Sequence, residues 1–244
     1  MKKSKILRIV ARPALWFINT KGFVYLTEFI GKFSVKPKFP MEDIHHLVNN
    51  VFGNSDTNSI YTFASTNTNH VMSWLIRKVT NDSRFSHAGL IIFDSEGWPF
   101  AVHMQPKGLV VEDLLSLLRH IDYICINEVK MSLENYETAV KRLNTLIDKS
   151  CELEYDFSQR MENGEDKFYC SEANYYVLEG LVDDVDLKTD LLYGISTFIP
   201  EQVTKVGDMV YSNHPDLKLE EDENDEIKTS EPETSNNEVV NPSK

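Results

Sequence analysis

Three side chains in this sequence have the residue types and the spacing that thiol chemistry requires. His87 heads an apolar run, His103 lies within the next one, and Cys170 lies where a loop is expected to turn into a helix. A thiolate is the attacking species in such chemistry, and both a helix N-terminus and a nearby imidazole lower the pKa of a thiol. The sequence therefore offers Cys170 as nucleophile, His87 as base and His103 as the group that orients the base.

The two histidines need neighbouring strands to bring them together. Alternation and turn residues predict strands over 88–93 and 100–104, with a turn over 94–97. If the hairpin is centred on Ser95, His87 and His103 are cross-strand partners with Cβ atoms about 5 Å apart. A bulge at Pro99 would spoil this register.

The remaining pattern predicts a mixture of strands and helices in one domain. Ser132 is expected to be the N-cap of an amphipathic helix over 132–149, and Cys170 to precede a helix over 171–180. Further elements are expected as strands at 60–63, 109–111 and 123–129, helices at 71–79 and 112–119, and a strand or turn at 195–199.

Each candidate also has a purely structural reading. A lone strand histidine is more often structural than catalytic, and a lone cysteine before a helix is more often packing. Their joint occurrence favours catalysis, whereas Cys125, inside an apolar strand, and Cys151, after a helix end, are expected to be inert. We therefore expect Cys170 to be the reactive thiol, with a lowered pKa and the His87 imidazole within about 4 Å of its sulfur.

Composition excludes several classes of function. The chain has 244 residues and a net charge of −13, and an acidic body argues against a nucleic-acid partner. Three cysteines without framework spacing indicate reduced thiols and an intracellular, cytoplasmic setting. No zinc-type metal motif and no apolar run long enough to span a membrane occurs, so neither a metal nor another cofactor is expected.

The two ends of the chain differ in charge from the middle. Residues 1–40 hold nine Lys or Arg and one acid among many aromatic residues. Such a segment either lies on an anionic membrane surface, making the protein peripheral, or packs as a basic helix on the acidic body. Residues 215–244 hold ten acids and are expected to be a disordered tail. Residues 41–214 remain for the folded domain.

The residues around the candidate site resemble those of a known family. The motifs are Val79-Thr80-x-Asp82-Ser83-x-Phe85-Ser86-His87-Ala88-Gly89-Leu90-Ile91, then Tyr155-Asp156-Phe157, Phe168-Tyr169-Cys170-Ser171-Glu172 and Phe198-Ile199-Pro200-Glu201. In order and spacing they resemble the circularly permuted papain-fold amidases (the YiiX/YebB-like group), over roughly residues 58–205. That group is related to the NlpC-type cysteine peptidases and to lecithin retinol acyltransferase.

The resemblance implies a fold and an activity. The fold would be α+β, a permuted papain-like (NlpC-type) arrangement of a small antiparallel sheet packed on helices. Cys170 would be the nucleophile, His87 the base and His103 the third polar residue. Many bacterial members of the family that this sequence resembles have Glu at that position, whereas the acyltransferase branch has His. The usual Gly-Asp before the first strand is replaced by Asn58-Ser59-Ile60.

The expected activity is cleavage of an amide or ester through an acyl-enzyme, as a thiol hydrolase or an acyltransferase. Peptidoglycan or peptide amides fit the wider family. Lipid esters or amides fit His103 and the basic, aromatic segment 1–40. The alternative is a catalytically silent binding module of the same fold, and the sequence carries no signal for the oligomeric state.

Overall fold

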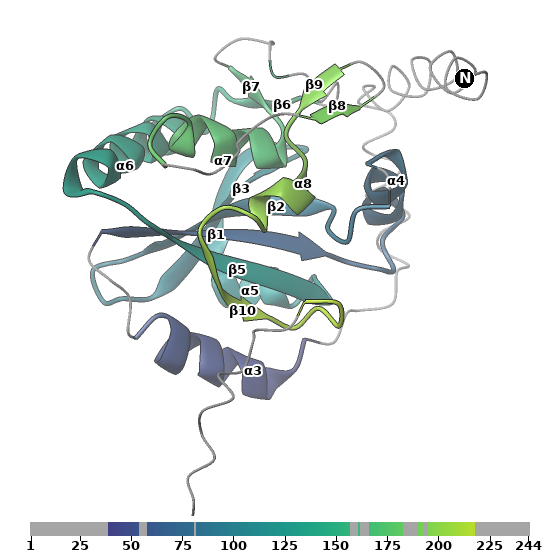
Figure 1. Ribbon diagram of the computed structural model, residues 1–244, viewed down its shortest axis with the longest axis horizontal. Coiled ribbons are helices and arrows are strands. Elements are labelled where there is room, and N and C mark those ends of the chain that lie inside the picture. The colour runs from purple at the N-terminus through teal and green to yellow at the C-terminus, as the bar shows by residue number, and fades with distance from the viewer. Residues whose placement is uncertain are drawn as a thin grey trace, which may run out of the picture.

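The computed structural model describes residues 39–53, 58–80, 82–156, 161, 166–182, 190–192 and 195–217. At its centre lies a six-stranded antiparallel sheet with the spatial order β10-β5-β1-β2-β3-β4 (Figure 1). The strands are β1 (Ser59–Thr66), β2 (His87–Phe93), β3 (Pro99–Gln105), β4 (Gly108–Asp113), β5 (Tyr123–Lys130) and β10 (Asp208–Ser212). The expected α+β class with an antiparallel sheet is confirmed.

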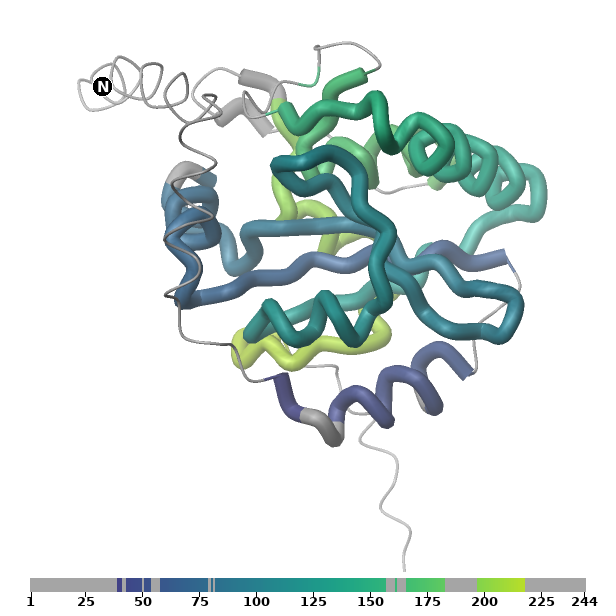
Figure 2. Tube along the Cα trace, turned by 180° about the vertical axis from the view of Figure 1, so that it is seen from behind, coloured from purple at the N-terminus to yellow at the C-terminus, as the bar shows by residue number. Residues whose placement is uncertain are grey.

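Helices cover both faces of this sheet, as the two opposite views show (Figures 1 and 2). On one face α7 packs on β2 and β3, and α6 packs on α7; on the other face α5 packs on β3 and β4. The helical segments are α3 (Met41–His46), η1 (Leu47–Val51), α4 (Val71–Val79), α5 (Leu114–Leu118), α6 (Leu133–Asp148), α7 (Cys170–Leu178) and α8 (Pro200–Val203). Two small sheets pair β6 (Glu154–Tyr155) with β7 (Lys167–Phe168) and β8 (Asp190–Leu192) with β9 (Ile195–Thr197).

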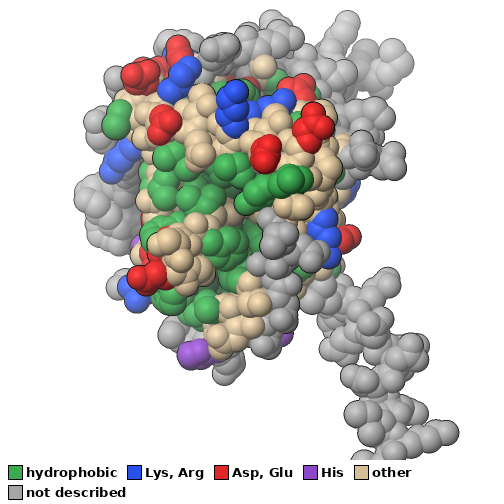
Figure 3. All heavy atoms as spheres, turned by 90° about the vertical axis from the view of Figure 1, so that its left-hand side faces the viewer, with side chains coloured by type: hydrophobic (Ala, Val, Ile, Leu, Met, Phe, Trp, Pro, Cys, Tyr) green, Lys and Arg blue, Asp and Glu red, His purple; other side chains and the backbone are tan. Residues whose placement is uncertain are grey.

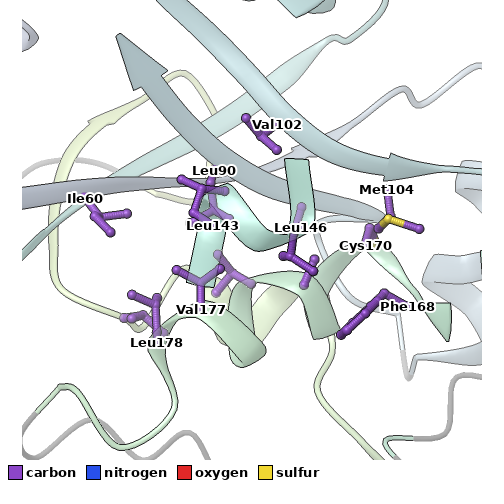
Figure 4. Close-up of a cluster of buried hydrophobic side chains, with 14 of the residues drawn as sticks. Ile60, Leu90, Val102, Met104, Leu143, Leu146, Phe168, Cys170, Val177 and Leu178 are labelled. Atoms are coloured by element: carbon purple, nitrogen blue, oxygen red, sulfur yellow. The ribbon is translucent and has the colours of Figure 1, made fainter. Parts of the chain in front are cut away.

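Strand alternation divides the apolar side chains into two cores. In β1, Ile60 and Ala64 belong to the core under α7, whereas Tyr61 and Phe63 belong to the core on the α5 side. This follows from the two-residue period of a strand, which sends successive side chains to opposite faces. Figure 4 shows the first core, which includes both Cys170 of α7 and Met104 of β3. The nucleophile candidate is therefore part of the packed interior on the α7 side.

Several expected elements begin or end where their capping residues dictate. The α6 helix starts after Ser132, whose hydroxyl accepts the Asn135 N–H as an N-cap should. The expected helix over 112–119 is shorter, because the Asp113 carboxylate caps α5 and accepts the Leu115 N–H at 2.7 Å. Residue Glu112 therefore belongs to β4, not to a helix.

The last strand of the sheet was not expected from the sequence. β10 pairs with β5, reached through Gly207 in a left-handed conformation with φ of 75°. A Cβ at this position would lie 2.3 Å from the Glu128 carbonyl oxygen, so only glycine fits the turn. β10 therefore closes the edge of β5 that would otherwise be exposed.

All the described elements fall within residues 41–214. The basic segment 1–40, apart from residues 39–40, and the acidic tail 215–244, apart from residues 215–217, lie outside the described part of the chain. Within the described part, no helix is both long enough and apolar enough to cross a bilayer.

Candidate active site

His87 is the first residue of β2, and the residues before it are held firmly. The Ser86 N–H donates to the Ser65 carbonyl at 3.0 Å, and the Ser86 hydroxyl is hydrogen-bonded to that of Ser73 in α4 at 2.6 Å. Two residues before Ser86, the Arg84 guanidinium is ion-paired with Glu201 of α8. These contacts fix the start of β2, so the His87 backbone is anchored before the strand begins.

The imidazoles of His87 and His103 lie against each other. The His87 Nε2 and His103 Nδ1 atoms are 2.6 Å apart, and the His103 Nε2 lies 2.8 Å from Glu112 Oε1. The His103 side chain is only 2% exposed, whereas that of Glu112 is 25% exposed. The three side chains form a continuous hydrogen-bonded chain from the start of β2, through β3, to β4, which we call the His87–His103–Glu112 relay.

The register that brings them together differs from the expected one. Leu90 lies opposite Val102, whereas a hairpin centred on Ser95 would put it opposite Phe100. The turn is centred one residue later, because the Asp94 N–H bonds the Trp98 carbonyl and Gly97 takes a φ of 81°. His87 and His103 are thus not directly opposite partners, and the prediction of direct cross-strand pairing is wrong. Their contact runs diagonally between strands, within reach of two imidazoles.

Burial sets the charge state of the His87 ring. Desolvation lowers the pKa of His87 well below 6.5, and the positive charge that His103 can carry lowers it further. At neutral pH the His87 ring is therefore uncharged, with one ring nitrogen available as an acceptor. A neutral imidazole is the form that can take a proton from a thiol.

Cys170 opens α7, whose N-terminus is tied to the segment before α8. The Tyr169 N–H donates to a carboxyl oxygen of Glu172 at 3.2 Å, and the Tyr169 hydroxyl accepts the Phe198 N–H at 2.8 Å. The Ser171 hydroxyl donates to the Phe198 carbonyl. Cys170 is consequently held at the first residue of the helix and is only 4% exposed.

The thiol is surrounded by hydrogen-bond donors but is deeply buried. The Ala88 N–H, the Tyr155 hydroxyl and the backbone and side chain of Ser171 all interact with its sulfur and favour the thiolate. Burial outweighs them and raises the pKa of Cys170 above 9.0. The expectation of a lowered thiol pKa is therefore wrong, because the sequence shows the helix start but not the burial.

The thiol and the imidazoles lie at the same end of the sheet but belong to opposite faces of it. The pairing of β2 with β3 ends at Leu90 opposite Val102, which leaves residues 87–89 and 103–105 as an open end that we call the β2–β3 fork. The sulfur interacts with the Ala88 N–H there from the α7 side. Both imidazoles lie near Phe63 of the other core, with ring centroids about 6 Å away. The separation of the His87 ring from the sulfur stays a prediction.

Gly89 keeps the β2–β3 fork compact. A Cβ on this residue would lie 2.6 Å from the Phe63 ring and 2.7 Å from the Val102 carbonyl oxygen. Any side chain here would push Phe63 away from the two imidazoles that it contacts. The glycine two positions after His87 therefore has a steric role in the site.

A small, uncharged pocket adjoins the thiol. Its volume is about 10 Å³, which is room for about one water molecule. The lining residues are Ile76, Thr80, Ser86, Tyr155, Tyr169, Cys170, Ser171, Thr197, Phe198, Ile199 and Pro200. A larger hollow of about 390 Å³ follows the outer face of α6 and contains none of the candidate site residues. A molecule larger than water could therefore reach Cys170 only if this small pocket widened.

The other two thiols differ from Cys170. Cys125 is buried in β5, and desolvation raises its pKa to about 12. Cys151 is exposed after α6, so exposure favours its reaction with added reagents. That Cys170 is the reactive thiol stays a prediction, and the exposure of Cys151 together with the burial of Cys170 acts against it.

The sequence does not predict three polar residues of the candidate site. The sequence argument includes Tyr155 only as part of a motif, and it predicts a helix at Glu112. Glu172, buried in α7, is the third. Tyr155 and Glu172 sit in the quoted motifs, so their proximity to Cys170 was a usable signal, whereas Glu112 is found only through the pairing of β3 with β4.

No metal-binding group is present in the described part of the chain, since no three of its His, Cys, Asp or Glu side chains are placed to hold an ion. The chain matches no known family model and none of the curated proteins.

Proposed function

We propose that the protein is a cysteine-dependent hydrolase or acyltransferase that cleaves an amide or ester bond, with Cys170 as nucleophile and His87 as base. The observation that carries the proposal is the His87–His103–Glu112 relay, which ends one peptide away from the Ala88 N–H that the Cys170 sulfur contacts. A hydrogen-bonded imidazole chain and a thiol at a helix start, both at this end of the sheet, are the parts that nucleophilic catalysis uses.

The proposed fold is a permuted papain-like (NlpC-type) arrangement. In papain-like enzymes the cysteine comes early in the chain and the histidine far downstream. Here the histidine strands β2 and β3 come first, and the cysteine helix α7 packs on them afterwards. The reversed order and the packing of α7 on an antiparallel sheet support the permutation.

The reaction starts from a neutral thiol and a neutral imidazole. His87 accepts the proton of Cys170 as the sulfur attacks the carbonyl carbon, and the carbonyl oxygen becomes an oxyanion. Backbone N–H groups at the start of α7 and the Tyr155 hydroxyl are the donors available to this oxyanion. The His87 imidazolium then returns the proton to the leaving amine or alcohol, which leaves an acyl group on Cys170.

The second half of the cycle transfers the acyl group. Water, or a second nucleophile in an acyltransferase, loses its proton to His87 and attacks the thioester. The tetrahedral intermediate collapses, and the thiolate leaves and takes the proton back from His87. No metal or organic cofactor is needed for either step.

The lining of the pocket restricts the acyl group. No side chain around it is charged at neutral pH, and most are aromatic or aliphatic. A neutral acyl group therefore fits better than a charged one, which leaves uncharged peptide or peptidoglycan amides and lipid esters or amides as substrates. We further propose a cytoplasmic location, with residues 1–40 binding an anionic membrane surface.

A binding module of the same fold is the second candidate. The face of the molecule at the left of Figure 1 has apolar side chains gathered at its centre, with charged residues around them (Figure 3). Contiguous apolar area on a surface is typical of a contact site. In this alternative the His87–His103–Glu112 relay would only stabilise the fold, and Cys170 would not catalyse any reaction.

Acylation of Cys170 by p-nitrophenyl acetate tests the proposal. The small ester suits the narrow pocket, and the experiment is done with Cys151→Ser so that no exposed thiol competes. We expect an acetyl adduct at Cys170 by mass spectrometry, lost in Cys170→Ser and formed slowly in His87→Ala. His45→Ala, an exposed histidine of α3, is the matched control. A protein that turns over the ester equally well without Cys170, or that never acquires the adduct, is not the proposed enzyme.

A further inference from the structure

We infer that Glu112 is a positioning residue that fixes the tautomers of both His103 and His87, so that the His87 Nδ1 atom is the basic one. The inference deepens the proposed function and rests on it for its catalytic meaning, but its structural content stands on the relay alone. It starts from two distances, 2.8 Å between Glu112 Oε1 and His103 Nε2 and 2.6 Å between His103 Nδ1 and His87 Nε2.

Proton positions follow from the chemistry of the end group. An ionised carboxylate only accepts hydrogen bonds, so the His103 Nε2 must carry a hydrogen and donate it to Glu112. In a neutral His103 the Nδ1 atom is then an acceptor. The His87 Nε2 must donate to it, which leaves the His87 Nδ1 with a free lone pair.

The carboxylate is ionised in the relay. The hydrogen bond from His103 is the largest influence on Glu112 and, against a smaller effect of burial, lowers its pKa below 4.5. The positive charges that His103 and His120 can carry act in the same direction, and Asp113 acts against them. At neutral pH Glu112 is therefore an acceptor, as the assignment requires.

Gln105 is a neighbour that could favour the opposite tautomer of His103. The Gln105 amide nitrogen lies 3.4 Å from the His103 Nε2 and 3.4 Å from Glu112 Oε1. An amide N–H donated to His103 Nε2 would require the hydrogen on His103 Nδ1. The Glu112 contact is shorter and charge-assisted, so it decides the tautomer, and Gln105 can donate to the carboxylate instead.

The reversed tautomers would disable the proposed base. With a hydrogen on His103 Nδ1, the His87 Nε2 becomes an acceptor and the neutral His87 carries its hydrogen on Nδ1. The lone pair would then face His103, and no proton could be taken from Cys170 through Nδ1. Replacing a carboxylate by an amide at the orienting position of a serine-protease triad lowers kcat by about 10⁴ for this reason.

The test is Glu112→Gln, because a glutamine amide can donate to His103 Nε2 as well as accept from it. Nitrogen-15 NMR of ¹⁵N-histidine protein, assigned with His87→Ala and His103→Ala, reads the protonated nitrogen of each ring. In the unsubstituted protein we expect hydrogen on Nε2 and none on Nδ1 in both rings. In Glu112→Gln we expect Nδ1 protonation to rise, and acetylation of Cys170 by p-nitrophenyl acetate to slow at least about tenfold.

Two variants separate the tautomer effect from a loss of charge or of fold. Glu96→Gln removes one negative charge from the exposed β2–β3 turn and should leave both the spectrum and acetylation unchanged. Glu112→Asp keeps a carboxylate and should retain more Nε2 protonation than Glu112→Gln. Unaltered tautomers in Glu112→Gln, or Nδ1 protonation of His87 in the unsubstituted protein, overturn the inference. If the tautomers shift as expected but Cys170 is never acetylated, the proposed function fails and the tautomer assignment survives.

Discussion

Replacing Glu172 by glutamine should stabilise the protein, increasingly so as the pH rises. The Glu172 side chain lies in the first turn of α7, is buried, and accepts the Tyr169 N–H. Burial, with a smaller contribution from the charge of Asp156, raises the pKa of Glu172 from 4.5 to about 8. The carboxyl is therefore protonated in the native protein at neutral pH, whereas it is ionised in the unfolded chain.

The sign and size follow from proton linkage. Between the unfolded pKa of 4.5 and the native value of about 8, the native state binds more protons, so the free energy of unfolding falls as pH rises. The slope is up to about 1.4 kcal/mol per pH unit, which gives about 2 kcal/mol between pH 6 and pH 8. Glutamine stays neutral and can still accept the Tyr169 N–H. The free energy of unfolding of Glu172→Gln should therefore not fall with pH in this way.

Urea unfolding of the two proteins, followed by circular dichroism at several pH values, measures the difference directly. The free energies should nearly coincide near pH 4 and separate progressively, with Glu172→Gln the more stable, until the gap stops growing above about pH 8. Glu137→Gln, an exposed residue of α6, controls for the lost charge and should give no such gap. Parallel stability curves for Glu172→Gln and the unsubstituted protein would show that the native carboxyl is ionised and refute the reasoning.

Three further results are expected. Because burial lowers the pKa of His87 well below 6.5, the rate of Cys170 acetylation should hold down to pH 6.5 and fall only in more acidic solution; a fall centred at or above 6.5 would contradict a desolvated base. Gly89→Ala should lose about 1–3 kcal/mol in urea unfolding, because its Cβ would meet the Phe63 ring at 2.6 Å, and unchanged stability would show that the β2–β3 fork has spare room. Deleting residues 1–40 should abolish co-sedimentation with anionic liposomes and leave Cys170 acetylation intact, whereas binding that persists in the truncated protein would exclude this segment as the anchor.

Local signals in the sequence predict the elements that carry the site. Alternation placed β2, and Ser132 placed the start of α6, because a two-residue period and an N-cap are local properties. The sequence does not predict β10, because residues 208–212 form a strand only by pairing with the edge of β5 after the turn at Gly207. Strand pairing between distant segments has no such local signal.

The candidate site could be predicted in its residues but not in its electrostatics. His87 and His103 lie together although their expected register is wrong, because a diagonal contact suffices for two rings. The thiol pKa was expected to fall with the helix start, but burial at 4% exposure raises it. Desolvation depends on what packs over a residue, which residue types alone do not reveal.

In the proposed mechanism, the opposite pKa shifts of Cys170 and His87 give the extension of the relay to Glu112 a role. Burial raises the pKa of Cys170 and lowers that of His87, so the resting pair carries no charge. Proton transfer creates a thiolate and an imidazolium together, in surroundings that disfavour both. Glu112, ionised and a quarter exposed to water, lies two hydrogen bonds from His87, and its negative charge offsets part of the cost of the imidazolium. In the proposed mechanism, a chain ending in a partly solvated carboxylate would therefore let a desolvated histidine act as a base.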